Sequence, residues 1–256
     1  MKIRQDKIRA DRLLFHQGLT QSREQGARLI MAGQAYMFRE NGEKEPIDKA
    51  GRMLPEDSVL GIREEDRFVS RGGHKLLTGI EHFQMDVQGK TALDVGASTG
   101  GFTDCLLQLG AARVYALDVG YGQLHWKLRT HPRVVNLERI NIRQAGAALL
   151  PEAVDLVTVD CSFISLRVVL PACLQFLKPG GLLLALIKPQ FELERGSTRK
   201  GVVRSPELQQ AAVERVRAFA EGLPGLKHSG VVPSRIKGPK GNQEYLALFR
   251  YEVQAL

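Results

Sequence analysis

The sequence predicts an α/β protein in which a small α+β module precedes a sheet of parallel strands with helices on both faces. From residue 91 onward, short apolar runs alternate with helical patterns, as expected for repeated β-α units. A glycine-rich turn at 96–102 follows the first of these runs and opens a helix. Residues 1–64 differ, because they carry alternating charges and little clustered glycine. We therefore expect domains at 1–64 and 71–256, joined by a linker at 65–70.

Two short helical patterns and several strand signals make up the N-terminal module. The first helix is expected to end at Gly18. Ile8, Leu13, Leu14 and Leu19 should lie roughly on one apolar face. The second should begin at Ser22, with Gln25 reaching back to its start, and end at Gly33. Strands are expected at 35–38 and 59–62, around a turn at Asn41-Gly42. A module of this size is too small to be the catalytic unit.

The second domain shows strand patterns at 91–95, 114–119, 134–137, 154–159, 182–187, near Val231 and at 245–251. A helix is expected after the glycine turn, another at 168–177, and a third beginning at Ser205-Pro206. Open α/β sheets bind ligands at the carboxyl ends of their strands. Asp160 and Lys188 follow the fourth and fifth strands, so we expect them at that edge.

Composition limits the cellular setting and the partners. The 256 residues carry a net charge of +8 with a pI of about 9.5. Such a basic surface favours phosphate backbones or anionic lipid, and the alternative is that it serves solubility alone. The sequence has neither a long apolar run nor a signal-peptide pattern, so we expect a cytoplasmic protein without a membrane span. We expect no metal, because the histidines lack ligand spacing.

The odd number of cysteines excludes a disulfide framework, and their spacing excludes a zinc finger. Cys105, Cys161 and Cys173 are interpreted as small buried hydrophobic residues. One alternative concerns Cys161, because RNA cytosine-5 methyltransferases attack their base with a cysteine near this place. That cysteine usually follows proline, whereas here Asp160 precedes it.

The glycine turn predicts a cofactor site. Nicotinamide enzymes have such a turn too, but Asp94 just before it would repel a pyrophosphate. The carboxylate suits the sulfonium and ammonium of S-adenosylmethionine, and Asp118 can accept the ribose hydroxyls. The candidate cofactor-binding residues are Asp94, Gly96, Ser98, Thr99, Gly100, Phe102, Asp118 and Asp160.

Several long segments resemble one family, namely ALDVGASTGGFTDCLL, ALDVGYGQLHWKLR, VDLVTVDCSFISL, IKPQFE and GNQEY. They are similar to the TlyA family of ribosomal RNA 2′-O-methyltransferases, historically labelled hemolysin A. The resemblance implies a Rossmann-like, S-adenosylmethionine-dependent domain that methylates a cytidine ribose, with ribosomal RNA or ribosomal subunits as partner. The N-terminal segment resembles the S-four RNA-binding domain, which implies that Arg9, Arg12 and Arg23 present cations to RNA. Oligomeric state stays open.

The wider FtsJ-like group uses a Lys-Asp-Lys-Glu tetrad, which the resemblance places at Lys75, Asp160, Lys188 and Glu244. A ribose hydroxyl is a very weak acid, so its proton needs a base. The expected base is Lys188, with Lys75 orienting the hydroxyl and the two acids holding the ammoniums. Two surface ion pairs are the plain alternative. The competing functions are a membrane-active hemolysin and a catalytically idle RNA-binding factor. The missing Asp/Asn-Pro-Pro-aromatic motif argues against amino methylation of a base.

Overall fold

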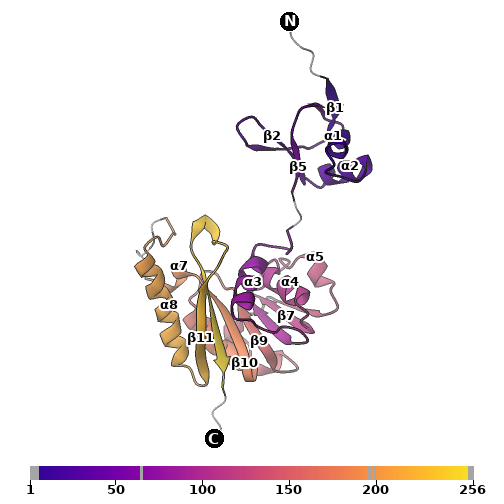
Figure 1. The fold of residues 1–256 in the computed structure, drawn as a ribbon. Coiled ribbons are helices and arrows are strands. Elements are labelled where there is room, and N and C mark those ends of the chain that lie inside the picture. The colour runs from indigo at the N-terminus through magenta and orange to yellow at the C-terminus, as the bar shows by residue number, and fades with distance from the viewer. Residues whose placement is uncertain (1–5, 64–65, 195, 197, 199, 253–256) are drawn as a thin grey trace. The chain divides into compact units, whose positions relative to one another are not determined.

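The computed structural model describes residues 6–63, 66–194, 196, 198 and 200–252 (Figure 1). Contacts divide the chain into two compact units, Met1–Arg67 and Phe68–Leu256. This division falls inside the expected linker at 65–70. Phe68, at the start of the second unit, is buried in that unit's core, and the Val69 amide donates to Asp104 Oδ2 at 2.9 Å. Phe68 and Val69, which were expected to belong to the linker, are therefore part of the folded second unit.

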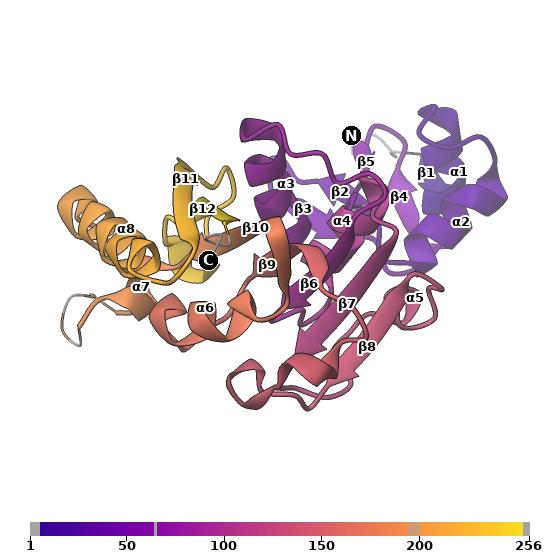
Figure 2. The ribbon, with the colours of Figure 1, turned by 90° about the horizontal axis from the view of Figure 1, so that it is seen from below.

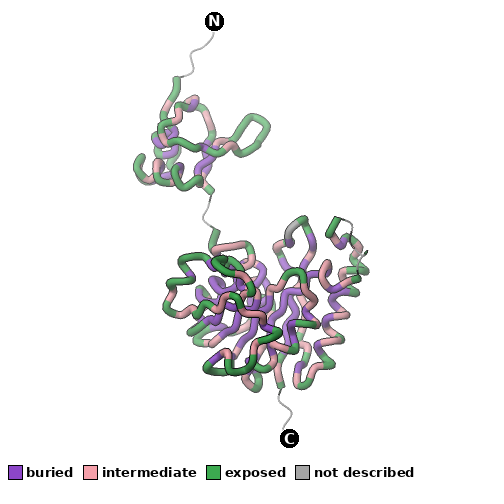
Figure 3. The backbone as a smooth tube through the Cα atoms, turned by 180° about the vertical axis from the view of Figure 1, so that it is seen from behind, coloured by how far each residue is buried: buried purple, intermediate pink, exposed green. Residues whose placement is uncertain are grey.

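Unit 1 combines two small antiparallel sheets with a helix pair. Its elements are β1 (Lys7–Arg9), α1 (Ala10–His16), α2 (Arg23–Met31), β2 (Ala35–Phe38), β3 (Lys44–Pro46), β4 (Met53–Pro55) and β5 (Leu60–Ile62). Strand β1 pairs with β4, and β2 lies between β3 and β5. Its core contains Leu13, Leu14 and Ile30. Figure 3 colours the buried segments of this unit purple. The α+β character expected for this part is confirmed.

The first predicted helix is wrong at both ends. Ile8 lies opposite Leu54 in the β1–β4 pair instead of on the helix, and Leu19 is partly exposed. A pairing partner far along the chain decides the conformation of Ile8. At α2 the predicted cap is confirmed, because the Gln25 amide donates to Ser22 Oγ. The Gln25 side chain reaches the amide of Gln21, one residue before the cap.

Unit 2 is an alternation of strands and helices. Its elements are α3 (Gly72–His82), β6 (Thr91–Val95), α4 (Gly101–Gln108), β7 (Arg113–Asp118), α5 (Trp126–Arg129), β8 (Val134–Glu138), β9 (Val154–Val159), α6 (Leu166–Leu174), β10 (Leu177–Ile187), α7 (Pro189–Glu192), α8 (Pro206–Glu221), β11 (Leu226–Pro233) and β12 (Tyr245–Tyr251). Short 3₁₀ turns lie at Ile142–Gln144, Ala147–Leu149 and Pro239–Gly241.

The seven described strands of unit 2 form one sheet in the order β11-β12-β10-β9-β6-β7-β8. Neighbours from β8 to β10 are parallel, whereas β12 runs antiparallel to both β10 and β11. The expectation of a wholly parallel sheet is therefore wrong. The short connection from β11 to β12 brings the chain back beside β11, which requires the opposite direction.

Helices cover both faces of this sheet, as expected (Figure 2). Helices α6 and α8 pack on one face through residues such as Val169 and Val216, while α3 and α4 pack on the other through Leu76 and Leu106. This arrangement confirms the α/β, Rossmann-like class. It also brings the carboxyl ends of β6, β7, β9 and β10 to one edge.

Strand β10 begins earlier than predicted and α6 ends earlier, at Leu174. Leu177 pairs with Val154 and Leu182 pairs with Leu156, so residues 178–181 form a bulge within the strand. Gly180 has a φ of 78°, which glycine adopts without strain. Proline lacks an amide hydrogen and is tolerated at bulges. The expected helix at 168–177 is therefore too long at its end.

Candidate active site

The glycine turn lies where β6 ends and α4 begins. Gly96 has a φ of 84°, and a Cβ there would lie 2.7 Å from the carbonyl oxygen of Asp160. Gly100 has a φ of 97°, and a Cβ would collide with Leu128. Both positions therefore require glycine, the first because the turn approaches the end of β9 and the second because α5 packs against it.

Asp94 lies beneath this turn and is fully buried. Its carboxylate accepts hydrogen bonds from Thr103 Oγ1 at 2.7 Å and Thr158 Oγ1 at 3.1 Å. Burial raises the pKa of Asp94 to about 7, although the two hydroxyls act in the opposite direction. Asp94 therefore ties α4 to β9 and does not itself line the cavities described below.

A cavity of about 410 Å³ opens beside the turn. Asp118 lies on its wall, where one carboxylate oxygen accepts from the Ser98 amide at 2.8 Å and the other from the Gly120 amide at 2.7 Å. Each oxygen keeps a lone pair for a further donor. The wall also contains apolar groups from Leu117, Val119 and Ile142. A flat, apolar ligand with adjacent hydroxyls fits such a cavity.

A second cavity, of about 290 Å³, adjoins the first across Gly96, Ser98 and Asp160. Of the predicted cofactor residues, it is lined by Gly96, Ser98, Thr99, Phe102 and Asp160. Gly100 lines neither cavity and supports the turn from below. The two cavities together form an elongated site that ends at Lys75 and Lys188.

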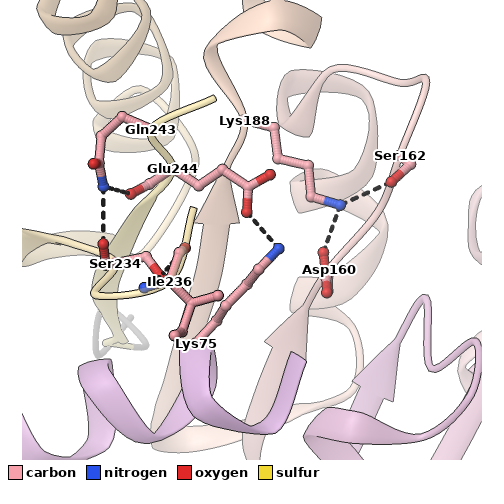
Figure 4. A network of polar contacts seen from close by, with 8 residues as sticks. All are labelled: Lys75, Asp160, Ser162, Lys188, Ser234, Ile236, Gln243 and Glu244. Carbon is pink, nitrogen blue, oxygen red and sulfur yellow. Dashed lines mark hydrogen bonds and ion pairs between the residues drawn. The ribbon is translucent and has the colours of Figure 1, made fainter. Parts of the chain in front are cut away.

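The four predicted tetrad residues come together as two ion pairs (Figure 4). Lys75 Nζ donates to Glu244 Oε2 at 2.6 Å, and Lys188 Nζ lies 2.6 Å from Asp160 Oδ1. Lys188 Nζ also donates to Ser162 Oγ at 2.8 Å. Lys75 is only 6% exposed, Lys188 8% and Glu244 0%. The alternative of two surface ion pairs is therefore wrong.

Different elements supply these side chains to one point. Asp160 follows β9 and Lys188 follows β10, which confirms that both lie at the carboxyl edge. Lys75 comes from the first turn of α3 and Glu244 from the residue before β12. Because Lys75 and Glu244 lie 169 residues apart, their contact depends on the complete domain.

The connection between β11 and β12 holds Glu244 in place. The Ser234 amide donates to the Glu244 carbonyl at 2.8 Å, and Gln243 Nε2 donates to the carbonyls of Ser234 and Glu244 (Figure 4). A Cβ at Gly238 would lie 2.0 Å from Glu244 Oε1, so only glycine lets the connection pass the carboxylate. Buried charges are tolerated when each has an opposite partner, and this geometry supplies one for each lysine.

A third cavity, of about 380 Å³, shares Lys75, Lys188 and Ser162 with the second cavity. Its remaining wall consists of Phe163 after β9, Gln190 and Phe191 of α7, Thr198 and Gly201, and Lys240, Asn242 and Glu244 of the β11–β12 connection. The paired lysines therefore stand between the elongated site and a separate pocket.

The sequence interpretation missed several residues at these cavities. Ser162 lies two residues after Asp160 and could have been considered for that reason. Gln190 and Asn141 had no local signal, because only tertiary packing brings them to the third and first cavities. Residues 195–204 are rich in glycine and basic residues, a composition that predicts either an RNA-facing or a solvated loop, but 195, 197 and 199 lie outside the described residues.

The cysteines provide no nucleophile. Cys105 and Cys173 are buried as predicted, whereas Cys161 is only partly buried. Desolvation nevertheless raises the pKa of the Cys161 thiol to about 12. The thiolate is the reactive form, so Cys161 is unsuited to attack. Within the described ranges, no cluster of three His, Cys, Asp or Glu side chains could hold a metal ion. Across the same ranges, no helix is long and apolar enough to cross a membrane.

The three predicted RNA-binding arginines lie in unit 1. Arg9 Nη2 donates to Asp11 Oδ2 at 2.8 Å and Arg23 Nε donates to the same oxygen at 3.1 Å. Asp11 is almost completely buried, whereas both arginine side chains are about half exposed. Arg12 is exposed. Asp11 therefore gathers two cations and leaves part of each guanidinium available to solvent.

Comparisons with known proteins agree on one family. A model of the FtsJ-like methyltransferase family matches residues 68–251. The 16S/23S rRNA (cytidine-2′-O)-methyltransferase TlyA of Mycobacterium tuberculosis is 43% identical over 96% of this chain and 91% of its own length. Hemolysin A of Brachyspira hyodysenteriae is 39% identical over 94% of this chain and 99% of its own. A solved structure from Streptococcus thermophilus, named as a candidate hemolysin, is 40% identical with a TM-score of 0.72 and covers 97% of this chain and 90% of its own.

Proposed function

The chain belongs to the FtsJ-like methyltransferase family, and from this membership we propose that it methylates the 2′-hydroxyl of a cytidine ribose in ribosomal RNA. The observation that carries the proposal is the buried Lys75–Glu244 and Lys188–Asp160 arrangement between the elongated site and the third cavity. A base placed between a donor site and an acceptor site is what hydroxyl methylation requires.

The elongated site suits S-adenosylmethionine, which supplies an electrophilic methyl group when bound. Asp118 has lone pairs for the two ribose hydroxyls, and the apolar wall with Ile142 fits an adenine ring. Gly96 and Ser98 border both cavities, so the ligand's middle portion would pass along their backbone. Asp94 contributes a buried carboxyl beneath this path and Asp160 one at its end.

Lys188 is placed to receive the hydroxyl proton. The ion-paired Lys188 must first release one proton to solvent, which leaves an amine with two N–H bonds and one lone pair. Ser162 Oγ accepts one N–H bond and Asp160 Oδ1 lies 2.6 Å from Nζ, so we expect the lone pair to point away from both. The proton of the 2′-hydroxyl then passes to Lys188 Nζ as the oxygen takes the methyl group. Lys75, held by Glu244, stabilises negative charge on that oxygen.

Unit 1 is proposed to bind the RNA. The half-exposed Arg9 and Arg23, with exposed Arg12, present donors suited to phosphate oxygens. The net charge of +8 favours the same partner. With ribosomal RNA or subunits as substrate, the protein would act in the cytoplasm. The alternative function, a membrane-active hemolysin, does not explain why the four tetrad residues are brought together in the interior.

Replacing Lys188 tests the proposal. In the Lys188→Ala variant, methyl transfer to ribosomal RNA should fall by about 10²- to 10⁴-fold, the usual contribution of a general base. Affinity for S-adenosylmethionine and for RNA should stay within a few-fold. The matched control is Lys178→Ala, because Lys178 also lies on β10 and pairs with Asp155 at the opposite edge. Near-normal turnover of Lys188→Ala would contradict the assignment.

A further inference from the structure

The third cavity differs from the elongated site in its neighbours. None of the predicted glycine-turn residues lines it, and its shared members with the second cavity are Lys75, Lys188 and Ser162. If the methyl donor occupies the elongated site, the acceptor must reach the lysines from the other direction. The third cavity opens from that direction and has a volume of about 380 Å³, within the range of ligand pockets.

Most polar groups on the wall of this cavity already have partners. Glu244 Oε2 accepts from Lys75, and Lys188 is paired with Asp160 and Ser162. Asn242 accepts from the Val203 amide and donates to the Gly201 carbonyl, so both ends of its amide are used. These groups therefore position the wall and the reacting atoms more than they select a ligand.

Two buried oxygens on this wall have no hydrogen-bond partner among the described residues, Glu244 Oε1 and Gln190 Oε1, and only Gln190 carries its oxygen on an uncharged amide. It lies in the first turn of α7, two residues after Lys188, and its Oε1 is buried without a hydrogen-bond partner among the described residues. An unsatisfied buried acceptor is costly and uncommon in native proteins. Its position on the cavity wall, beside the ring of Phe191, indicates that a ligand supplies the missing donor.

We propose that the third cavity receives the base of the acceptor nucleotide and that Gln190 recognises the amino group of cytosine. This inference rests on the proposed function. Cytosine presents an N4 amino donor beside the N3 acceptor, which matches the acceptor and donor of a glutamine amide. Uracil presents an O4 acceptor beside an N3 donor. If Gln190 Oε1 accepts from the base, uracil would place its O4 acceptor against that oxygen. Enzymes that act on an extruded base commonly read it through this edge.

The test compares cytidine and uridine at the target position of one ribosomal RNA substrate. For Gln190→Ala, kcat/KM on cytidine should fall by about ten- to a hundredfold, the usual value of a good amide–base pair. The uridine rate should change little, so the preference for cytidine collapses. Gln190→Glu keeps an acceptor for N4 but places a carboxylate oxygen against the N3 acceptor, so its cytidine rate should also fall below that of the parent. Gln175→Ala, at the exposed end of α6, is the matched control.

The outcomes separate this inference from the proposed function. An unchanged cytidine-to-uridine ratio in Gln190→Ala, with the parent protein active on RNA, would overturn the role of Gln190 alone. Equal losses on both bases would also overturn it, because a purely structural residue affects both. S-adenosylmethionine titration of each variant verifies that it is folded. If the parent protein transfers no methyl group to RNA, the proposed function fails as well.

Discussion

Asp94→Asn should make unit 2 more stable at neutral pH while weakening cofactor binding. In the native protein, burial raises the pKa of Asp94 to about 7, compared with 3.8 for an unperturbed aspartate. Between these two values the folded protein holds a proton that the unfolded chain has released. The contribution of this proton to the free energy of unfolding is therefore fully present below about pH 4 and is lost as the pH rises through about 7.

The size of this effect follows from the two pKa values. The difference between 3.8 and about 7 corresponds to about 4 kcal/mol, at about 1.4 kcal/mol per tenfold change. Asparagine resembles the protonated carboxyl and can still bond to Thr103 and Thr158, whose hydroxyls rotate to suit. Parent and variant should match near pH 4. At pH 8 the variant should be more stable by about 4 kcal/mol.

Urea unfolding of both proteins at pH 4, 6 and 8 measures this difference. The difference in free energy of unfolding between the two proteins at each pH cancels the contribution of groups that titrate in both. Glu192, whose pKa is also raised by burial, is one of these groups. A difference that does not change with pH would refute the reasoning. Calorimetry with S-adenosylmethionine should show weaker binding to Asp94→Asn, because the variant lacks the negative charge beneath the cofactor path. Unchanged affinity would mean that Asp94 serves only to tie α4 to β9.

Two further results are expected. Deleting residues 1–64 should weaken RNA binding and reduce the slope of log K against log salt by up to about 0.9 for each lost phosphate contact, while cofactor titration stays unchanged; an unaltered slope would exclude unit 1 as the RNA anchor. Cys161→Ser should keep turnover within about twofold, because a thiol with a pKa of about 12 is protonated at neutral pH; loss of methyl transfer would restore the cysteine mechanism.

The sequence predicted those elements whose signal is local. Strands β6, β9 and β12 occupy the predicted ranges 91–95, 154–159 and 245–251, because each consists mainly of apolar residues that are buried in the sheet. Strand β1 was missed because its three residues become a strand only by pairing with β4. The bulge in β10 was missed because a Lys-Pro-Gly-Gly sequence usually interrupts a strand.

The same distinction applies to the site. Asp160 and Lys188 could be predicted together because both follow strands of one sheet, whose carboxyl ends meet. The pairing of Lys75 with Glu244 came from family resemblance, since no local pattern relates residues 169 positions apart. Gln190 had neither kind of signal. Its meaning depends on one unsatisfied oxygen atom, which only the packed structure reveals.

The insertion of β12 between β10 and β11 has a consequence for the order in which the site matures. During synthesis, Lys75, Asp160 and Lys188 emerge from the ribosome well before Glu244. Until β12 pairs with β10, Lys75 has no carboxylate opposite it, and enclosing a lone ammonium would be strongly unfavourable. We therefore expect Lys75 to stay accessible to solvent in the nascent domain until β12, the last described strand, has paired with β10. The active site and the sheet should therefore be completed in the same step of folding.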